Sequence, residues 1–152
     1  MQKRKAAILA GLVAGIATTA FMVVGRKTGV LTKTLDRDAV DWIDRTTGSR
    51  DVIGDTGTSI VEFANHMGAS AAFGAALPTL REWAPTMSPV ALGTLYGTAL
   101  YAVNIAGIAP VLGITEGEVQ AGPRKAGERW IVHVLQGVIT ALVAERLERQ
   151  VD

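Results

Sequence analysis

The chain has 152 residues, of which 49% are hydrophobic and 19% charged, and its formal net charge is +1. It contains no cysteine, which excludes disulfides, thiolate metal sites and cysteine nucleophiles. The near-zero net charge and the lack of a basic patch with interleaved aromatic residues argue against nucleic acid as a partner. Charged residues are separated from long uncharged runs that hold most of the 17 glycines. This pattern predicts one all-α integral membrane domain over residues 1–152.

The first predicted span covers residues 6–25, an uncharged run that follows three consecutive cations. Its length of about 20 residues matches the hydrocarbon core of a bilayer. A cleavable signal peptide also fits a basic start and an apolar stretch. The run continues through residues 21–24, past any small-residue cleavage site, so a retained helix is expected. Gly11 and Gly15 share one face, which predicts close packing against another helix.

An amphipathic helix is predicted at residues 35–46, in the long connection between the first two spans. Thr34 precedes it as a candidate N-cap, and Gly48 is the candidate terminator. Trp42 lies on its apolar side, which suits the plane of the membrane interface. A solvated helix that covers the end of the bundle is the alternative.

The second predicted span, residues 57–80, carries three strongly polar residues in its first half. Glu62, Asn65 and His66 share one face of a helix. Such groups are costly inside a membrane unless they have partners. We therefore treat them as part of a candidate site.

The third predicted span covers residues 88–109. Gly93 and Gly97 form a second Gly-x-x-x-Gly pattern, and Asn104 and Gly107 lie on the same helical face. Small residues on one face predict a close approach to a neighbouring helix.

The fourth predicted span covers residues 128–145, and its two faces differ in character. His133, Gln136 and Gly137 lie on one face, while the opposite face is aliphatic. This distribution predicts a polar face toward the bundle and an aliphatic face toward lipid.

Four antiparallel spans place both termini on one side of the membrane and the two longer loops on the other. The strongly polar groups all fall in the half nearest the loops: Glu62, Asn65, His66, Asn104, His133 and Gln136. The predicted interfacial anchors are Trp42 and Trp130 on the loop side and Trp83 on the other. Lys and Arg are more numerous on the loop side, but acids nearly match them there. We expect the termini in the cytoplasm.

The polar groups leave four interpretations open. Glu62, His66 and His133 are a candidate ligand set for a divalent metal, and the two histidines are candidate axial ligands of a haem. The same groups suit proton relay or substrate coordination in a small transporter or channel. In the fourth interpretation they hydrogen-bond one another and fix the order of the helices, and no cofactor is predicted. No catalytic residues are predicted, because the sequence shows no nucleophile–base pattern and no glycine-rich phosphate loop.

The second half of the chain carries a series of short motifs. They are His66, Phe73-Gly74, Pro85, Gly93-x-x-x-Gly97, Pro110-x-x-Gly113 and His133. This series resembles the YagU-like family of small bacterial inner-membrane proteins of unknown function. The resemblance implies that Glu118 or Glu128 matches the family's acid before the last histidine. The sequence departs from the family at Asn104, where the family tends to have a histidine.

The expected function is that of a small multi-pass protein of the bacterial inner membrane. We expect a non-catalytic subunit or accessory component that packs through its glycine-rich helix faces. Its partners would be the lipid bilayer and other membrane subunits, or further copies of itself. The alternatives are a small transporter or channel that uses the Glu/His/Asn cluster, and a metal- or haem-binding membrane protein.

Overall fold

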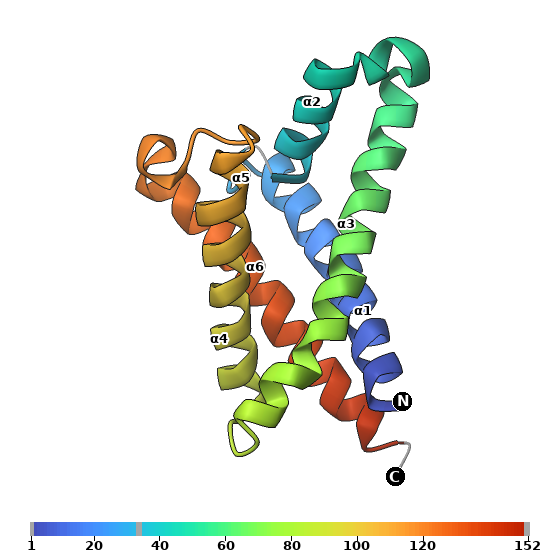
Figure 1. Ribbon diagram of the computed structural model, residues 1–152, viewed down its shortest axis with the longest axis vertical. Coiled ribbons are helices and arrows are strands. Elements are labelled where there is room, and N and C mark those ends of the chain that lie inside the picture. Colours follow the sequence, from blue (N-terminus) through green and yellow to red (C-terminus); the bar gives the residue numbers. More distant parts are fainter. Residues whose placement is uncertain (1, 33–34, 151–152) are drawn as a thin grey trace.

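The computed structural model describes residues 2–32 and 35–150, and within these residues every regular element is a helix. The elements are α1 (Gln2–Lys27), α2 (Leu35–Thr47), α3 (Ser49–Trp83), α4 (Pro89–Leu100), the π-helix η1 (Tyr101–Ile108), α5 (Ala109–Val111) and α6 (Glu118–Glu148). The all-α prediction is confirmed for the described part of the chain. Long helices alternate in direction, so both chain ends lie at one end of the bundle, the terminal end (Figure 1). The connections around α2 and α5 lie at the opposite end, the loop end (Figure 1).

Three helical stretches are long and apolar enough to cross a membrane. They are α1, the continuous run Pro89–Val111, and α6. The predicted second span, residues 57–80, is helical within α3 but does not belong to this set. Its polar residues, Glu62, Asn65 and His66 among them, lower its hydropathy below that of the other three.

Two helices begin earlier than the sequence predicted. α3 starts at Ser49, eight residues before position 57, and α6 starts at Glu118, ten residues before position 128. Each helix contains a kink at a glycine with positive φ, at Gly54 (φ 65°) and Gly122 (φ 81°). The predicted spans therefore begin after these kinks, and each helix continues on the other side of its glycine.

The helix predicted at residues 35–46 corresponds closely to α2. Gly48 ends it in a left-handed conformation (φ 65°, ψ 26°), as predicted, and α3 follows at the next residue. The predicted cap, Thr34, lies outside the described residues.

The predicted third span is continuous, but it changes helix type after Leu100. Over Tyr101–Ile108 the backbone is a π-helix, and the N–H of Ala109 donates to the carbonyl of Asn104. The Asn104 amide donates to the carbonyl of Leu100 (2.9 Å) and competes there with the backbone. Pro110 supplies no N–H and its ring disfavours a regular α-helical turn before it. Both features loosen this stretch.

The glycines of the two Gly-x-x-x-Gly patterns lie at crossings between helices of the same chain. In α1, Gly11 meets the backbone of Ser70 and Gly74 in α3, and Gly15 meets Ser70. A Cβ on any of these glycines would collide with its neighbour.

A second crossing joins α4 to α6. A Cβ at Gly93 would lie 2.5 Å from the Cα of Val138, and one at Gly97 would collide with the carbonyl of His133. Gly137 faces back onto Gly93. The prediction for Gly107 is wrong: this residue is exposed, and only its own helix comes within 4 Å. The wider π-helical turn moves Gly107 off the line of Gly93 and Gly97.

The apolar core occupies the terminal half of the bundle. It is a cluster of buried small and large side chains: Ala10, Leu77, Leu92, Tyr96, Ala141 and Ala144. The Tyr96 hydroxyl donates to the carbonyl of Phe73 in α3 (2.6 Å). These contacts join α3 to α4 in the terminal half, although α3 makes few contacts with α4 and α6 overall.

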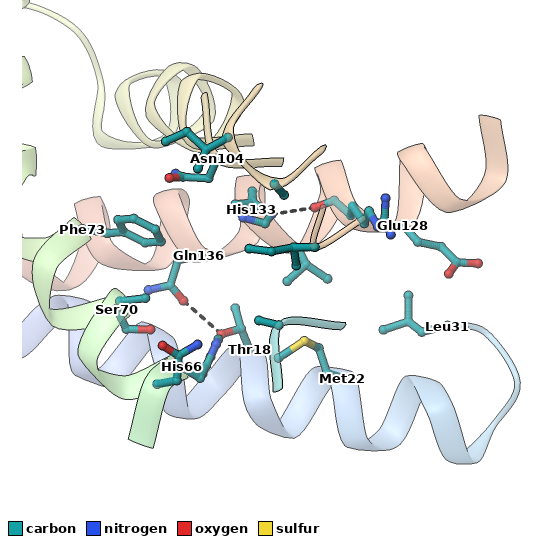
Figure 2. A pocket seen from close by; sticks show the side chains of 18 of the residues that line it. Thr18, Met22, Leu31, His66, Ser70, Phe73, Asn104, Glu128, His133 and Gln136 are labelled. Atoms are coloured by element: carbon teal, nitrogen blue, oxygen red, sulfur yellow. Dashed lines mark hydrogen bonds between the residues drawn. The ribbon is translucent and has the colours of Figure 1, made fainter. Parts of the chain in front are cut away.

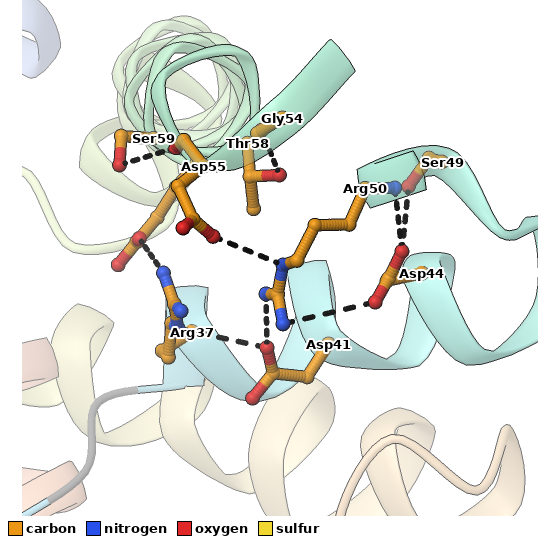
Figure 3. Close-up of polar contacts among 10 residues, drawn as sticks. Arg37, Asp41, Asp44, Ser49, Arg50, Gly54, Asp55, Thr58 and Ser59 are labelled. Atoms are coloured by element: carbon orange, nitrogen blue, oxygen red, sulfur yellow. Dashed lines mark hydrogen bonds and ion pairs between the residues drawn. The ribbon is translucent and has the colours of Figure 1, made fainter. Parts of the chain in front are cut away.

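Ion pairs hold α2 against α3 at the loop end (Figure 3). Arg50 in α3 lies 2.9 Å from an Asp41 carboxylate oxygen and 3.8 Å from one of Asp44. The hydrogen bond to Asp41 raises the pKa of Arg50 above its ordinary value, so the guanidinium stays charged. Arg37 in α2 reaches Glu62 in α3 at 3.5 Å. These pairs tie α2 to the bundle in a way that its amphipathic pattern alone did not predict.

The three tryptophans differ in exposure. Trp83, at the end of α3, is 84% exposed. Trp130 is 40% exposed and donates from Nε1 to the Thr98 hydroxyl (3.2 Å). Trp42 in α2 is half-buried. Trp83 lies toward the terminal end and the other two toward the loop end, which is the distribution that the sequence predicted.

Candidate functional site

A cavity of about 250 Å³ lies in the loop half of the bundle. Its walls come from α1, α3, η1 and α6, with a contribution from Ala39 of α2. Most of the lining is apolar, with Met22, Phe73 and Ile108 among the larger side chains. Figure 2 shows polar side chains from three of the walls pointing into the same space.

Five of the six strongly polar residues predicted to gather near the loops line this cavity. They are Asn65, His66, Asn104, His133 and Gln136. Glu62 does not: its carboxylate is 3.5 Å from Arg37, on the side of α3 that faces α2. An i, i+4 pattern places Glu62 and His66 on one helical face, but the nearby cation of α2 fixes the carboxylate away from the cavity.

A chain of hydrogen bonds crosses one wall of the cavity from α3 through α1 to α6. Its step from Thr18 to Gln136 is drawn in Figure 2. His66 Nε2 lies 3.1 Å from the carbonyl oxygen of Gly15 and 3.2 Å from Thr18 Oγ1. Because a carbonyl only accepts, Nε2 carries the proton in this arrangement. Thr18 Oγ1 lies 3.0 Å from Gln136 Oε1 and can donate to it. Gln136 Nε2 in turn donates to the carbonyl of Gly11 (3.3 Å).

Thr18 is the centre of this chain, and it is fully buried. It was assigned no role from the sequence, although it is buried on α1 together with Gly11 and Gly15. A threonine on a small-residue face is the signal that could have identified it, because its hydroxyl must find partners when buried.

The opposite wall is built around the π-helix. His133 Nδ1 donates to the carbonyl of Arg129 one turn earlier in α6 (2.8 Å). Its ring meets Tyr101 edge to face, with centroids 6.2 Å apart. The Asn104 amide uses one N–H on the carbonyl of Leu100. The polar side chains of this wall are thus held in place by η1 and α6.

Arg129 is the residue that sequence reasoning missed. Its side chain is 6% exposed and lines the cavity, although its neighbours in the sequence lie near the start of the predicted fourth span. It donates to Glu118 (2.6 Å) and to Asp38 of α2 (3.2 Å). Glu118 also accepts from the Tyr101 hydroxyl (2.6 Å). Among the described residues, Arg129 Nε has no hydrogen-bond partner.

This buried cluster joins three elements that the sequence left apart. Asp38 comes from α2, Tyr101 from η1, and Glu118 from the first turn of α6. A buried arginine needs such partners, because an uncompensated charge in the interior is strongly destabilising. No local sequence pattern predicts this cluster, because the two partner carboxylates lie 91 and 11 residues from Arg129 in the sequence.

Glu128 is the other charged residue that lines the cavity. Its carboxylate accepts from the Thr32 backbone N–H (2.8 Å) and hydroxyl (2.6 Å) and from Arg124 (3.1 Å). The cavity therefore contains one cationic and one anionic side chain, and each is already paired with other groups.

The metal interpretation needs three ligating side chains together. Among residues 2–32 and 35–150, no such group of His, Asp and Glu is found. Glu62 faces Arg37, and the two histidines stand on different walls, each bonded to a backbone carbonyl. The arrangement suits hydrogen bonding to an uncharged molecule better than ion coordination.

Comparison of the chain with models of protein families, with curated proteins and with solved structures finds no match. The resemblance to the YagU-like family therefore stays a prediction that is based on the short motifs alone.

Proposed function

We propose that the chain is a non-catalytic, four-span membrane protein whose loop-half cavity binds a small lipophilic molecule. The observation that carries the proposal is the cavity itself. About 250 Å³ of mostly apolar space lies between four helices, with hydrogen-bonding side chains on its walls. Ligand sites in proteins share this character of apolar walls with a few placed polar groups.

The direction of the helices supports a fourth crossing by α3. In Figure 1, α1 and α4 run in the same direction, from the terminal end to the loop end. If both cross the membrane, the chain between them must return across it once. Of the elements between them, α3 has 35 residues, more than the about 20 that a crossing needs, and it packs along α1. Residues on its outer face include exposed Ile60 and Phe63, which suit contact with lipid.

In this proposal α2 lies at the membrane surface on the loop side. The ion pairs of Arg37 and Arg50 hold it to α3, and Trp42 is half-buried beside them. The resemblance to the YagU-like family adds the bacterial inner membrane as the location. The termini are placed in the cytoplasm, as expected from the charges around the spans.

Two other expected functions, an accessory subunit and a proton transporter, fit the structure less well than ligand binding. Gly93, Gly97 and Gly137 pack against helices of the same chain, as do the glycines of α1. An accessory subunit that docks through those faces is less favoured, because a partner would have to replace internal contacts. A transporter that relays protons through Glu62 is less favoured too, because that side chain lies outside the cavity.

A cavity-filling variant tests the binding proposal. The protein is reconstituted in phosphatidylcholine nanodiscs and titrated with the uncharged fluorophore N-phenyl-1-naphthylamine, with empty discs subtracted. Ala69 lines the cavity, whereas Ala72 lies on the exposed side of the same helix. We expect saturable binding that Ala69→Trp weakens at least tenfold and Ala72→Trp leaves unchanged. Equal binding by wild type and Ala69→Trp would show that the cavity is not the site.

A further inference from the structure

We place an opening of the cavity where α3 faces η1, because an exposed residue of each helix, Asn65 and Ile108, lines it. Asn65 and Phe73 of α3 and Asn104 and Ile108 of η1 all line it. The two helices do not pack extensively on each other, because α3 packs on α1 and α2 while η1 packs on α6. Asn65 is exposed and yet lines the cavity, which places it at the mouth.

Three of the polar groups available to a ligand are carboxamides, and Arg129 Nε is a further donor without a partner among the described residues. The side-chain amide of Asn65 makes no hydrogen bond to the described residues. Asn104 and Gln136 each use one N–H on a backbone carbonyl of α4 or α1, which leaves each amide a second N–H. A carboxamide is uncharged and both donates and accepts, so it matches a carbonyl, amide or hydroxyl group on a ligand.

The charges around the cavity disfavour an ion of either sign. Arg129 and Glu128 are opposite in sign, and each is already bonded to other residues of the chain. An anion would find the arginine already bonded to Asp38 and Glu118. A cation would find Glu128 already bonded to Thr32 and Arg124. Either ion would lose its water in a largely apolar space without gaining an unpaired counter-charge.

From these observations we infer that the ligand is an uncharged amphiphile from the lipid phase. Its headgroup, a carbonyl, amide or hydroxyl, would enter between α3 and η1 and bond the carboxamides. An exposed asparagine at membrane depth is costly without a partner, and the headgroup would supply one for Asn65. The volume of the cavity corresponds to about eight waters of liquid, at about 30 Å³ each. It therefore holds a headgroup and the first part of a chain, and the rest of the chain would remain in the lipid.

This inference rests on the proposed binding function and makes it specific. The test is competition against bound N-phenyl-1-naphthylamine in the same nanodiscs by three molecules with one ten-carbon chain: decanamide, decanoate and decylammonium. Concentrations are corrected for the partitioning of each into empty discs. We expect decanamide to displace the fluorophore at concentrations at least tenfold lower than either ion. Equal or better displacement by decanoate or decylammonium would overturn the inference and leave the proposed function standing.

A variant separates recognition of the headgroup from filling of the cavity. Asn65→Ala removes the amide at the mouth, and Gln120→Ala removes an exposed amide that does not line the cavity. Asn65→Ala should reduce the advantage of decanamide at least threefold while binding of the fluorophore persists, and Gln120→Ala should change neither. An unchanged advantage in Asn65→Ala would contradict the inference. Absence of saturable fluorophore binding to the wild type would remove the proposed function and this inference with it.

Discussion

The close crossing of α4 and α6 predicts that alanine at Gly97 destabilises the protein, whereas alanine at an open glycine position does not. At Gly97 the added Cβ would collide with the carbonyl oxygen of His133 and lie 2.6 Å from the Cα of Val134. The second distance is about 0.8 Å short of the 3.4 Å at which ordinary van der Waals contact begins. Both neighbours are backbone atoms, so no rotamer change relieves the overlap and the helices must move apart. We expect Gly97→Ala to lower the free energy of unfolding by about 1–3 kcal/mol, the usual cost of overpacking.

Gly68 is the matched control for this variant. It lies within α3 and is exposed, and an added Cβ meets nothing within 4 Å. Alanine there should be neutral or should stabilise the helix by up to about 1 kcal/mol, because alanine loses less backbone entropy than glycine. Reversible unfolding in mixed micelles with increasing dodecyl sulfate, followed by circular dichroism, gives both values. A Gly97→Ala variant as stable as Gly68→Ala would refute the account of this crossing.

Three further substitutions distinguish polar side chains that stabilise the fold from those that do not, and the same unfolding measurement applies to each. Arg129→Gln should lower the free energy of unfolding by about 3–5 kcal/mol, because it leaves two carboxylates without their buried cation. Arg124→Gln is the control: its side chain is 71% exposed, so the loss should be less than about 1 kcal/mol. Equal losses for the two variants would contradict the buried cluster. Glu62→Gln should lower the free energy of unfolding by at most about 1 kcal/mol, because its contact with α2 is a single 3.5 Å pair near the surface. A loss of several kcal/mol would show that Glu62 belongs to the polar interior after all. Thr18→Val should cost about 1–3 kcal/mol through lost hydrogen bonds to α3 and α6, while Thr19→Val, whose hydroxyl reaches only its own helix, should be nearly neutral.

The sequence was informative wherever one helix carried the whole signal. The small-residue faces of α1, α4 and α6 and the polar faces of α3 and α6 follow from helical periodicity alone. Alternation of the helices then brings Asn65, His66, Asn104, His133 and Gln136 to one half of the bundle. The structure places all five around one cavity.

The features that the sequence did not reveal depend on contacts between elements or on competition along the backbone. Glu62 turns from the cavity because Arg37 arrives from α2, a partner 25 residues away. Arg129 was not identified as a buried residue, because its partners Asp38 and Glu118 lie 91 and 11 residues away in the sequence. Gly107 left its predicted face because the helix widens over Tyr101–Ile108. Periodicity of 3.6 residues assumes an α-helix and cannot anticipate that change.

The central structural claim is that α3 crosses the membrane and brings the polar cavity into the loop half. The chain has no cysteine, so single-cysteine variants can be labelled without background. Asp51 and Glu82 are exposed and lie near opposite ends of α3. In sealed vesicles of one orientation, an impermeant maleimide should label Asp51→Cys or Glu82→Cys before the membrane is opened, and the other only afterwards. Labelling of both from the same side would contradict the four-span account.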